Sequence, residues 1–256
     1  MTTDMIKKEI TVSIDIDGKK VVVGGMAKGS GMIEPNMGTM LSFISTDAKI
    51  SAELLDSALR EAVKVSYNRI SVDGDTSTND TVIILANGMA ENESISSKNE
   101  DYYAFVEALK YITIEISKML AKDGEGATKL IECTVNGCKN EKEGVIFAKS
   151  VITSSLVKTA MFGADANWGR VLCALGYAGV DFEPEKVDVE FVSKAGTILV
   201  CKNGASVDFS EDLAKKILLE DEITIKVNMG SGSESVTCYG CDLTYDYVKI
   251  NGDYRS

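Results

Sequence analysis

Apolar and polar residues alternate near the start of the chain in the pattern of a β-hairpin. Ile10, Val12 and Ile14 are separated by polar residues, and Asp17-Gly18 stands between them and the run Lys19-Lys-Val-Val-Val23. Asp-Gly between two such runs is a strong hairpin signal. Clusters of β-branched and apolar residues predict further extended segments. They are Val82–Ala86, Lys129–Val135, Val187–Phe191, Ile198–Cys201, Ile223–Val227 and a tail from Val236 to Ile250.

A helical period marks a second set of elements. Its clearest case follows Ser97 and Glu100, which have the spacing of a capping box. Apolar residues behind them recur at three- and four-residue intervals, as on one face of a helix. They are Tyr102, Phe105, Val106, Leu109, Ile112, Ile116 and Leu120. This helix is expected to end near Asp123–Gly126. Further helices are predicted over 52–67, 143–158 and 210–219, with a short one after Asp165–Trp168.

Strands and helices alternate without an internal repeat and without the rhythm of a dinucleotide-binding fold. The pattern therefore predicts an α+β fold of mixed sheets with covering helices. A hydrophobic content of 45% and only two prolines indicate a compact globular chain. No Pro-rich or Ser-rich linker divides the sequence, so we expect one domain over residues 1–256, with room for two lobes.

The formal net charge of −12 opposes binding to nucleic acid or to an anionic membrane surface. No apolar run has the length of a membrane span, and the N-terminus lacks the apolar core of a signal peptide. These features favour the cytoplasm. Cys238 and Cys241 have the spacing of a metal or redox motif, but a tetrahedral zinc site needs two further ligands. Reduced, buried cysteines are the simpler interpretation, and no metal is expected.

Histidine is absent from the chain, so a nucleophilic enzyme of this sequence needs another general base. One solution is cleavage before a threonine, whose freed α-amine then serves as the base. Gly38 directly precedes Thr39, and its small size leaves the scissile carbonyl accessible. The nearby segment Gly24–Gly31 lacks the order of a phosphate loop or a dinucleotide fingerprint, and by its local pattern is best explained as a flexible turn. It includes one cation, Lys28.

Eight segments together resemble the self-cleaving ornithine acetyltransferase (glutamate N-acetyltransferase) family, in the family's order and over essentially the whole chain. They are Met1-Thr-Thr-Asp4, Gly24–Ile33, Pro35–Leu41, Asp73–Thr81, Asp123–Lys129, Ser155–Ala160, Asn167-Trp-Gly-Arg170 and Val248–Ser256. The resemblance implies a self-cleaving fold like that of enzymes with an N-terminal nucleophile. It also implies ping-pong acetyl transfer from N-acetylornithine to glutamate in arginine biosynthesis. No cofactor is implied, although some members use acetyl-CoA as a substrate.

By motif, the resemblance makes Thr39 the nucleophile and Gly38–Thr39 the bond that is cut. Lys28, Thr39, Glu125, Asn251 and Ser256 match the substrate-binding positions. Lys28 would pair with a substrate carboxylate and Glu125 would accept an ammonium. Without the resemblance, Glu125 and Asn251 would be read as turn residues, and Ser256 as a frayed terminus. The segments Asp73–Thr81 and Asn167–Arg170 are signatures to which we assign a scaffolding role.

Two departures from the family qualify this prediction. Gly38 stands where the family usually has alanine, and the chain begins at a motif that a long upstream segment precedes in the family. That segment carries the Thr-Gly pair of the oxyanion hole, and losing one such donor costs on the order of 10²–10³ in rate. The alternatives are therefore an inactive fragment, a non-catalytic subunit that needs an upstream partner chain, or a related self-cleaving amidohydrolase or aminopeptidase. Surface left uncovered would favour association, and the family implies a heterotetramer of cleaved chains.

Overall fold

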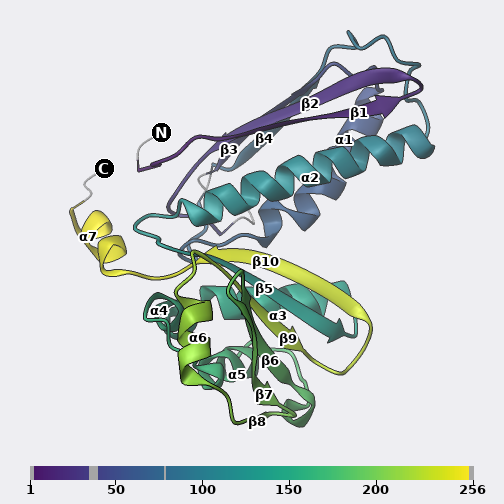
Figure 1. Ribbon diagram of the computed structural model, residues 1–256. Helices are drawn as coiled ribbons and strands as arrows, with labels where there is room; N and C mark the ends of the chain where they lie inside the picture. The colour runs from purple at the N-terminus through teal and green to yellow at the C-terminus, as the bar shows by residue number, and fades with distance from the viewer. Residues whose placement is uncertain (1–2, 35–39, 78, 254–256) are drawn as a thin grey trace. The chain divides into compact units, whose positions relative to one another are not determined.

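A computed structural model describes residues 3–34, 40–77 and 79–253 (Figure 1). The chain forms two compact units. Unit 1 contains Met1–Ile70 and Asp75–Leu120, and unit 2 contains Ser71–Gly74 and Ala121–Ser256. The predicted single domain over residues 1–256, with its N-terminal part absent and a cut between 38 and 39, stays a prediction.

Unit 1 is a four-stranded sheet covered on one face by two helices. The strand order is β1-β2-β3-β4, and only the β3–β4 pair is parallel. The strands are β1 (Lys8–Ile16), β2 (Lys19–Lys28), β3 (Leu41–Thr46) and β4 (Thr81–Ala86). The helices are α1 (Ala52–Val65), the short 3₁₀-helix η1 (Tyr67–Arg69) and α2 (Glu100–Lys122), whose last two residues belong to unit 2.

The predicted hairpin is confirmed as β1 and β2, which pair from Lys8–Ala27 to Ile16–Lys19. Asp17 and Gly18 both have positive φ, 53° and 70°, as a type I′ turn requires. The apolar face of α2 is also confirmed, because all seven predicted residues are at most 1% exposed. The capping box is wrong: Asn99 Oδ1 accepts from Tyr102 N at 3.0 Å, so Asn99 caps the helix in place of Ser97.

Unit 2 is a six-stranded sheet in the order β10-β5-β9-β6-β7-β8, in which only β5 and β9 are parallel. The strands are β5 (Leu130–Cys138), β6 (Asp188–Ser193), β7 (Gly196–Lys202), β8 (Ala205–Ser206), β9 (Glu222–Asn228) and β10 (Glu234–Cys241). The helices are α3 (Glu141–Thr153), α4 (Ser155–Phe162), α5 (Trp168–Gly176), the 3₁₀-helix η2 (Pro184–Lys186), α6 (Glu211–Leu218) and α7 (Tyr245–Asp253).

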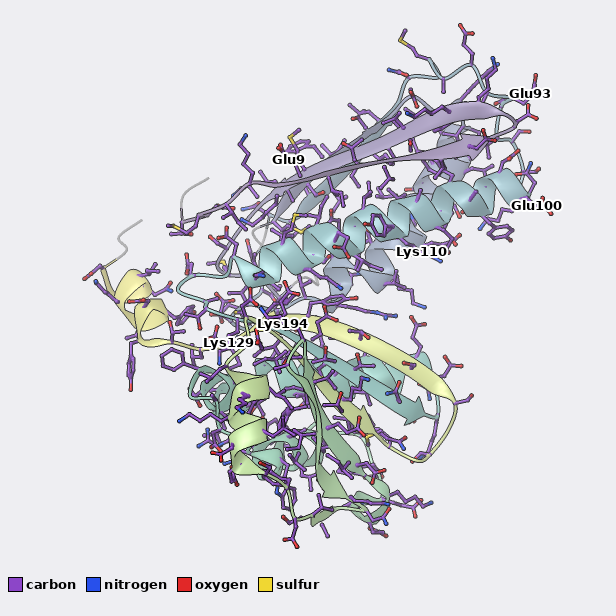
Figure 2. The ribbon with its side chains drawn as sticks, viewed as in Figure 1. Glu9, Glu93, Glu100, Lys110, Lys129 and Lys194 are labelled. Atoms are coloured by element: carbon purple, nitrogen blue, oxygen red, sulfur yellow. The ribbon has the colours of Figure 1, made fainter. Side chains whose placement is uncertain are left out.

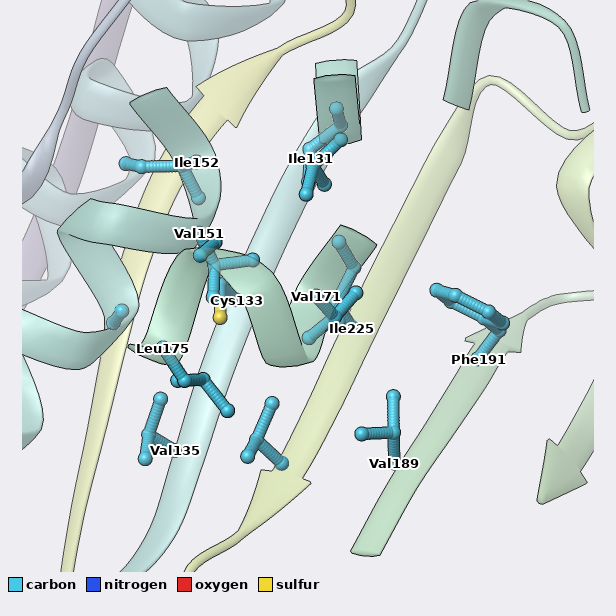
Figure 3. Close-up of a cluster of buried hydrophobic side chains, with 14 of the residues drawn as sticks. Ile131, Cys133, Val135, Val151, Ile152, Val171, Leu175, Val189, Phe191 and Ile225 are labelled. Carbon is cyan, nitrogen blue, oxygen red and sulfur yellow. The ribbon is translucent and has the colours of Figure 1, made fainter. Parts of the chain in front are cut away.

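One hydrophobic core joins this sheet to its helices. Figure 3 shows side chains of β5, β6 and β9 meeting those of α3 and α5. Along β9, Ile223, Ile225 and Val227 are buried while the residues between them are not, so one face of the strand faces the core. With its mixed sheets and covering helices, the chain has the predicted α+β architecture.

Two predicted elements of unit 2 differ in the structure. The helix expected over 143–158 is two helices, because Ser154 leaves the helical conformation (φ −65°, ψ 112°) and its side chain accepts from Val157 N to begin α4. The tail expected to be extended to Ile250 is a strand only to Cys241, and α7 follows it. In the described part of the chain no single helix could cross a membrane; α3 and α4 reach the length and hydropathy only as a pair, bent by 57°.

Candidate functional site

Of the site residues predicted in unit 1, the structure describes Lys28, the half-buried last residue of β2. Its partner in the β2–β3 register is Leu41, two residues after Thr39. Side chains of directly opposed strand residues lie about 5 Å apart at Cβ. Gly38 and Thr39 themselves lie outside the described residues.

The N-terminal motif holds the residue that follows Lys28. Asp4 Oδ1 accepts from Gly29 N at 2.7 Å and from Lys8 Nζ at 2.8 Å. Thr3 Oγ1 is 2.6 Å from Ser30 Oγ. Burial alone would raise the pKa of Asp4, but the Gly29 N–H and the Lys8 ammonium outweigh it and lower that pKa to about 2. The motif therefore acts as a clamp on the end of β2.

The glycine-rich segment is a strand where the sequence suggested a flexible turn. Gly24 to Lys28 belong to β2 and pair with β3. The reason for glycine at 25 is space, because a Cβ there would lie 2.9 Å from Ile116 Cδ1 of α2. The helix can pack this closely only against a residue without a side chain. The turn interpretation fails for this part of the segment.

The start of β3 is fixed on its other side by β4. Asp80 Oδ1 accepts from Met40 N at 2.5 Å, and Met40 O accepts from Thr81 N at 3.0 Å. Met40 is 1% exposed. The signature segment Asp73–Thr81 thus reaches the residue that follows Thr39.

Unit 2 contributes a tight turn that carries Glu125. Gly126 has φ of 68°, and a Cβ there would lie 2.5 Å from Tyr247 N, so only glycine fits. Thr244 Oγ1 donates to Gly126 O at 2.6 Å. Asp242 Oδ1 accepts from Thr128 N at 2.8 Å and from Lys129 N at 3.0 Å, and its Oδ2 accepts from Thr128 Oγ1. These bonds tie the turn to the chain just after β10.

Two predicted substrate-binding residues of unit 2 are in contact. Asn251, on α7, donates from Nδ2 to Glu125 Oε2 at 2.9 Å, although 126 positions separate them. The same Nδ2 donates to Tyr247 O at 3.1 Å. Tyr247 Oη donates to Asp73 Oδ2 at 3.4 Å. The third predicted residue, Ser256, lies outside the described residues.

Sequence reasoning gave no individual role to Asp4, Asp80, Asp242, Thr244 or Tyr247, although it assigned a scaffolding role to the segment Asp73–Thr81, which contains Asp80. Asp4 and Asp80 belong to segments that carried the resemblance, so their membership in a motif was the available signal. Asp242, Thr244 and Tyr247 lie just outside those segments. Their part in the site becomes visible only from their hydrogen bonds to backbone or side-chain groups in the structure.

The buried lysines of unit 2 have structural partners. Lys158, from the signature Ser155–Ala160, donates from Nζ to Val72 O and Cys241 O, each at 2.7 Å. Lys129, directly before β5 (Figure 2), donates to Met161 O and Leu218 O, and burial lowers its pKa. Lys129 thus binds carbonyls in the last turns of α4 and α6, and Lys158 binds one carbonyl at the end of β10 and one in the loop before Asp73.

The cysteines are all free thiols, and only Cys173 is exposed. Burial raises the pKa of Cys241 and of Cys133, which pairs with Cys238 in the β5–β10 register. Within the described ranges, no three His, Cys, Asp or Glu side chains come together as a metal site would require. The described residues instead provide charged groups that can bind an organic substrate. In unit 1 this group is Lys28, opposite Leu41. In unit 2 it is the carboxylate of Glu125, which is oriented by the amide of Asn251.

Comparison with known proteins gives a consistent result. The model of the ArgJ family matches residues 1–256. Arginine biosynthesis bifunctional protein ArgJ 1 of Clostridium acetobutylicum is 57% identical over the whole of this chain and 63% of its own length. The ArgJ protein of Caldanaerobacter subterraneus subsp. tengcongensis is 52% identical, over 64% of its length.

The crystal structure of arginine biosynthesis bifunctional protein ArgJ from Bacillus halodurans is similar, with a TM-score of 0.80 and 46% identity. The match covers 84% of this chain and 100% of that one. This confirms the predicted resemblance of the fold to the ornithine acetyltransferases. The chain spans a little under two thirds of the length of the curated relatives named above. Since the family model covers every residue, the chain belongs to the ArgJ family.

Proposed function

We propose that this chain carries the nucleophile and part of the substrate site of an acetyltransferase that moves an acetyl group from N-acetylornithine to glutamate. The observation that carries the proposal is the family match over residues 1–256, with relatives named as bifunctional proteins of arginine biosynthesis. The Glu125–Asn251 contact supports it, because two residues chosen by motif meet in space.

Before the enzyme can transfer an acetyl group, it matures by cleavage of its own Gly38–Thr39 bond. The hydroxyl of Thr39 attacks the Gly38 carbonyl carbon, the C–N bond breaks, and an ester forms that water hydrolyses. The freed α-amine has an ordinary pKa of about 7.7–8.0, so it serves as a base near neutral pH.

Acetyl transfer then proceeds through an ester on Thr39. The α-amine takes the hydroxyl proton while Oγ1 attacks the acetyl carbonyl of N-acetylornithine. The tetrahedral intermediate collapses, the C–N bond breaks, and ornithine leaves with the proton. The amine of glutamate then attacks the ester, which gives N-acetylglutamate and restores Thr39. Lys28 binds a substrate carboxylate, while Glu125, held by Asn251, accepts a substrate ammonium. Ser256 completes the substrate site.

The proposal also includes an upstream segment or a partner chain. The relatives are longer than this chain, and one face of the unit 1 sheet exposes four large apolar side chains. They are Met26, Phe43, Ile83 and Leu85. Exposed apolar surface of this kind favours association. We therefore expect an upstream segment or partner chain to supply the oxyanion donors, and cleaved chains to assemble as a heterotetramer. Acetyl-CoA is a candidate second donor, with no bound cofactor.

The test is to express the chain with and without the coding sequence that precedes it in its genome. Intact mass should show pieces split between Gly38 and Thr39, and ornithine should be released from N-acetylornithine only when glutamate is present. Thr39→Ala should abolish both cleavage and transfer. Ser45→Ala, which removes an exposed hydroxyl on β3, is the matched control and should change neither.

Other outcomes identify the alternatives. Ornithine release that does not depend on glutamate would indicate an amidohydrolase, since water would then be the acceptor. An uncut chain that binds ornithine without turnover, even beside the upstream product, would indicate a non-catalytic subunit. Either result would refute the acetyltransferase proposal.

A further inference from the structure

Tyr247 on α7 lies among the contacts around Glu125, and the proposed mechanism gives it no part. Its backbone comes so close to the turn that carries Glu125 that a Cβ on Gly126 would lie 2.5 Å from Tyr247 N. Its carbonyl oxygen accepts from Asn251 Nδ2 at 3.1 Å, and the same Nδ2 donates to Glu125 Oε2 at 2.9 Å. The backbone of Tyr247 therefore contacts both the turn and the amide that orients the carboxylate.

Helix α7 takes its position from polar contacts. None of its described residues is buried, so it has no apolar face packed in a core. At its start, Thr244 Oγ1 accepts from Asp246 N at 3.2 Å and donates to Gly126 O at 2.6 Å. Such bonds, more than apolar packing, decide where the helix places Asn251.

The phenol of Tyr247 ties this helix to a fixed part of unit 2. Its Oη donates to Asp73 Oδ2 at 3.4 Å. The chain beside Asp73 is held firmly, since Ser71 N donates to a carbonyl oxygen of β10 at 2.9 Å. The carbonyl oxygen of Val72 accepts from the buried Lys158 ammonium at 2.7 Å. Asp73 is therefore a well-placed acceptor for a helix that lacks a core contact.

The two substrates of the proposed reaction differ at the end that Glu125 would recognise. The α-nitrogen of N-acetylornithine is acylated, so its ammonium lies at the end of the side chain. Glutamate has a carboxylate at that end, and its amine is the group that attacks the ester. A protein carboxylate attracts the ammonium and repels the carboxylate. The placement of Glu125 therefore matters for binding N-acetylornithine and much less for binding glutamate.

We infer that Tyr247 is a positioning residue that selects the donor substrate: its bond to Asp73 fixes α7, and α7 holds Glu125, through Asn251, against the side-chain ammonium of N-acetylornithine. The inference rests on the proposed function and adds Tyr247 and Asp73 to it. Tyr247 acts through Asn251 and Glu125, and it exchanges no proton with the substrate.

The test compares Tyr247→Phe and Asp73→Ala with the parent, each in the chain expressed with its upstream coding sequence. Phenylalanine keeps the ring and the backbone contacts and removes only the phenol hydroxyl. Both variants should raise the KM for N-acetylornithine by about threefold to tenfold, while kcat and the KM for glutamate stay within about twofold of the parent. Because both changes break one bond, the double variant should lose about as much as either single variant.

Two comparisons separate this role from a general effect on the fold. In the Glu125→Gln background, Tyr247→Phe should not change the KM for N-acetylornithine further, because the carboxylate that it positions is gone. Tyr245→Phe is the matched control, since it makes the same chemical change on the same helix at an 84% exposed position. It should leave both KM values unchanged.

An unchanged KM for N-acetylornithine in Tyr247→Phe would overturn the inference. So would an equal rise in both KM values, or a clear loss of stability of Tyr247→Phe in urea, because the hydroxyl would then serve the whole site or the fold. A parent protein that releases no ornithine from N-acetylornithine in the presence of glutamate would instead refute the proposed function. The two failures are therefore distinguishable.

Discussion

The Asp4–Lys8 pair gives a prediction whose size follows from the structure. Their side chains are 3% and 0% exposed, and the Oδ1–Nζ distance is 2.8 Å. The pKa of Asp4 falls from 3.8 to about 2 on folding. At 1.36 kcal/mol per pKa unit, this shift corresponds to about 2.5 kcal/mol of stability. Asp4→Asn removes that contribution and takes the carboxylate away from the buried Lys8 ammonium, and removing one member of a buried ion pair can cost about 3–5 kcal/mol. We expect a loss of roughly 2–4 kcal/mol, since Asn keeps an acceptor for Gly29 N.

Urea denaturation at pH 7 of the parent, Asp4→Asn, Lys8→Met and the double variant would measure this loss. Because the ions compensate each other, the double variant should lose clearly less than the sum of the single variants. The pH dependence has a definite sign. The folded pKa is depressed, so the contribution is complete above about pH 4 and disappears as the pH falls toward 2. A loss below 1 kcal/mol in Asp4→Asn, or additive single losses, would refute the reasoning.

Two further predictions test the packing of β2 and the role of Glu125. Gly25→Ala should lower the free energy of unfolding, measured by urea denaturation, by about 1–3 kcal/mol, because its Cβ would lie 2.9 Å from Ile116 Cδ1. Ile116→Val removes that Cδ1, so adding it to Gly25→Ala should recover part of the loss. No recovery would contradict the contact. Glu125→Gln should raise the KM for N-acetylornithine about tenfold or more, since a charged hydrogen bond of about 1.5–3 kcal/mol is lost. The control is Glu107→Gln on α2, where the side chain is 71% exposed, and it should leave this KM unchanged. An unchanged KM in Glu125→Gln would exclude the ammonium role.

The sequence predicts best those elements whose apolar residues face the core. The face of α2 and the alternation along β9 are of this kind. Strand β3 follows the rule only in part and was not predicted. Its buried face carries Ser42 and Thr46 beside Ile44, while Phe43 on the other face is 49% exposed. The buried hydroxyls are satisfied by Tyr67 Oη and by Val22 O, contacts between distant segments that hydropathy does not encode.

Helix α7 escaped prediction for a related reason. None of its described residues is buried, so it has no apolar stripe to reveal a helical period. Its position depends on the close approach of Tyr247 to Gly126 and on the bond between Asn251 and Glu125. The residue identities at this site could be read from the motifs. The bond that brings Asn251 to Glu125 could not, because it depends on a turn 126 positions earlier.

The acidic residues that sequence reasoning left without a role share one structural task. Asp4 accepts from Gly29 N, Asp80 from Met40 N, and Asp242 from the backbone of Thr128 and Lys129. Each therefore fixes main chain, not another catalytic side chain. This suits a chain without histidine, since a base made from an α-amine is part of the backbone and can be oriented only by orienting the backbone. In the proposed function, Asp80, which binds the N–H of the residue after Thr39, would do for such an enzyme what the histidine-orienting aspartate does in a catalytic triad.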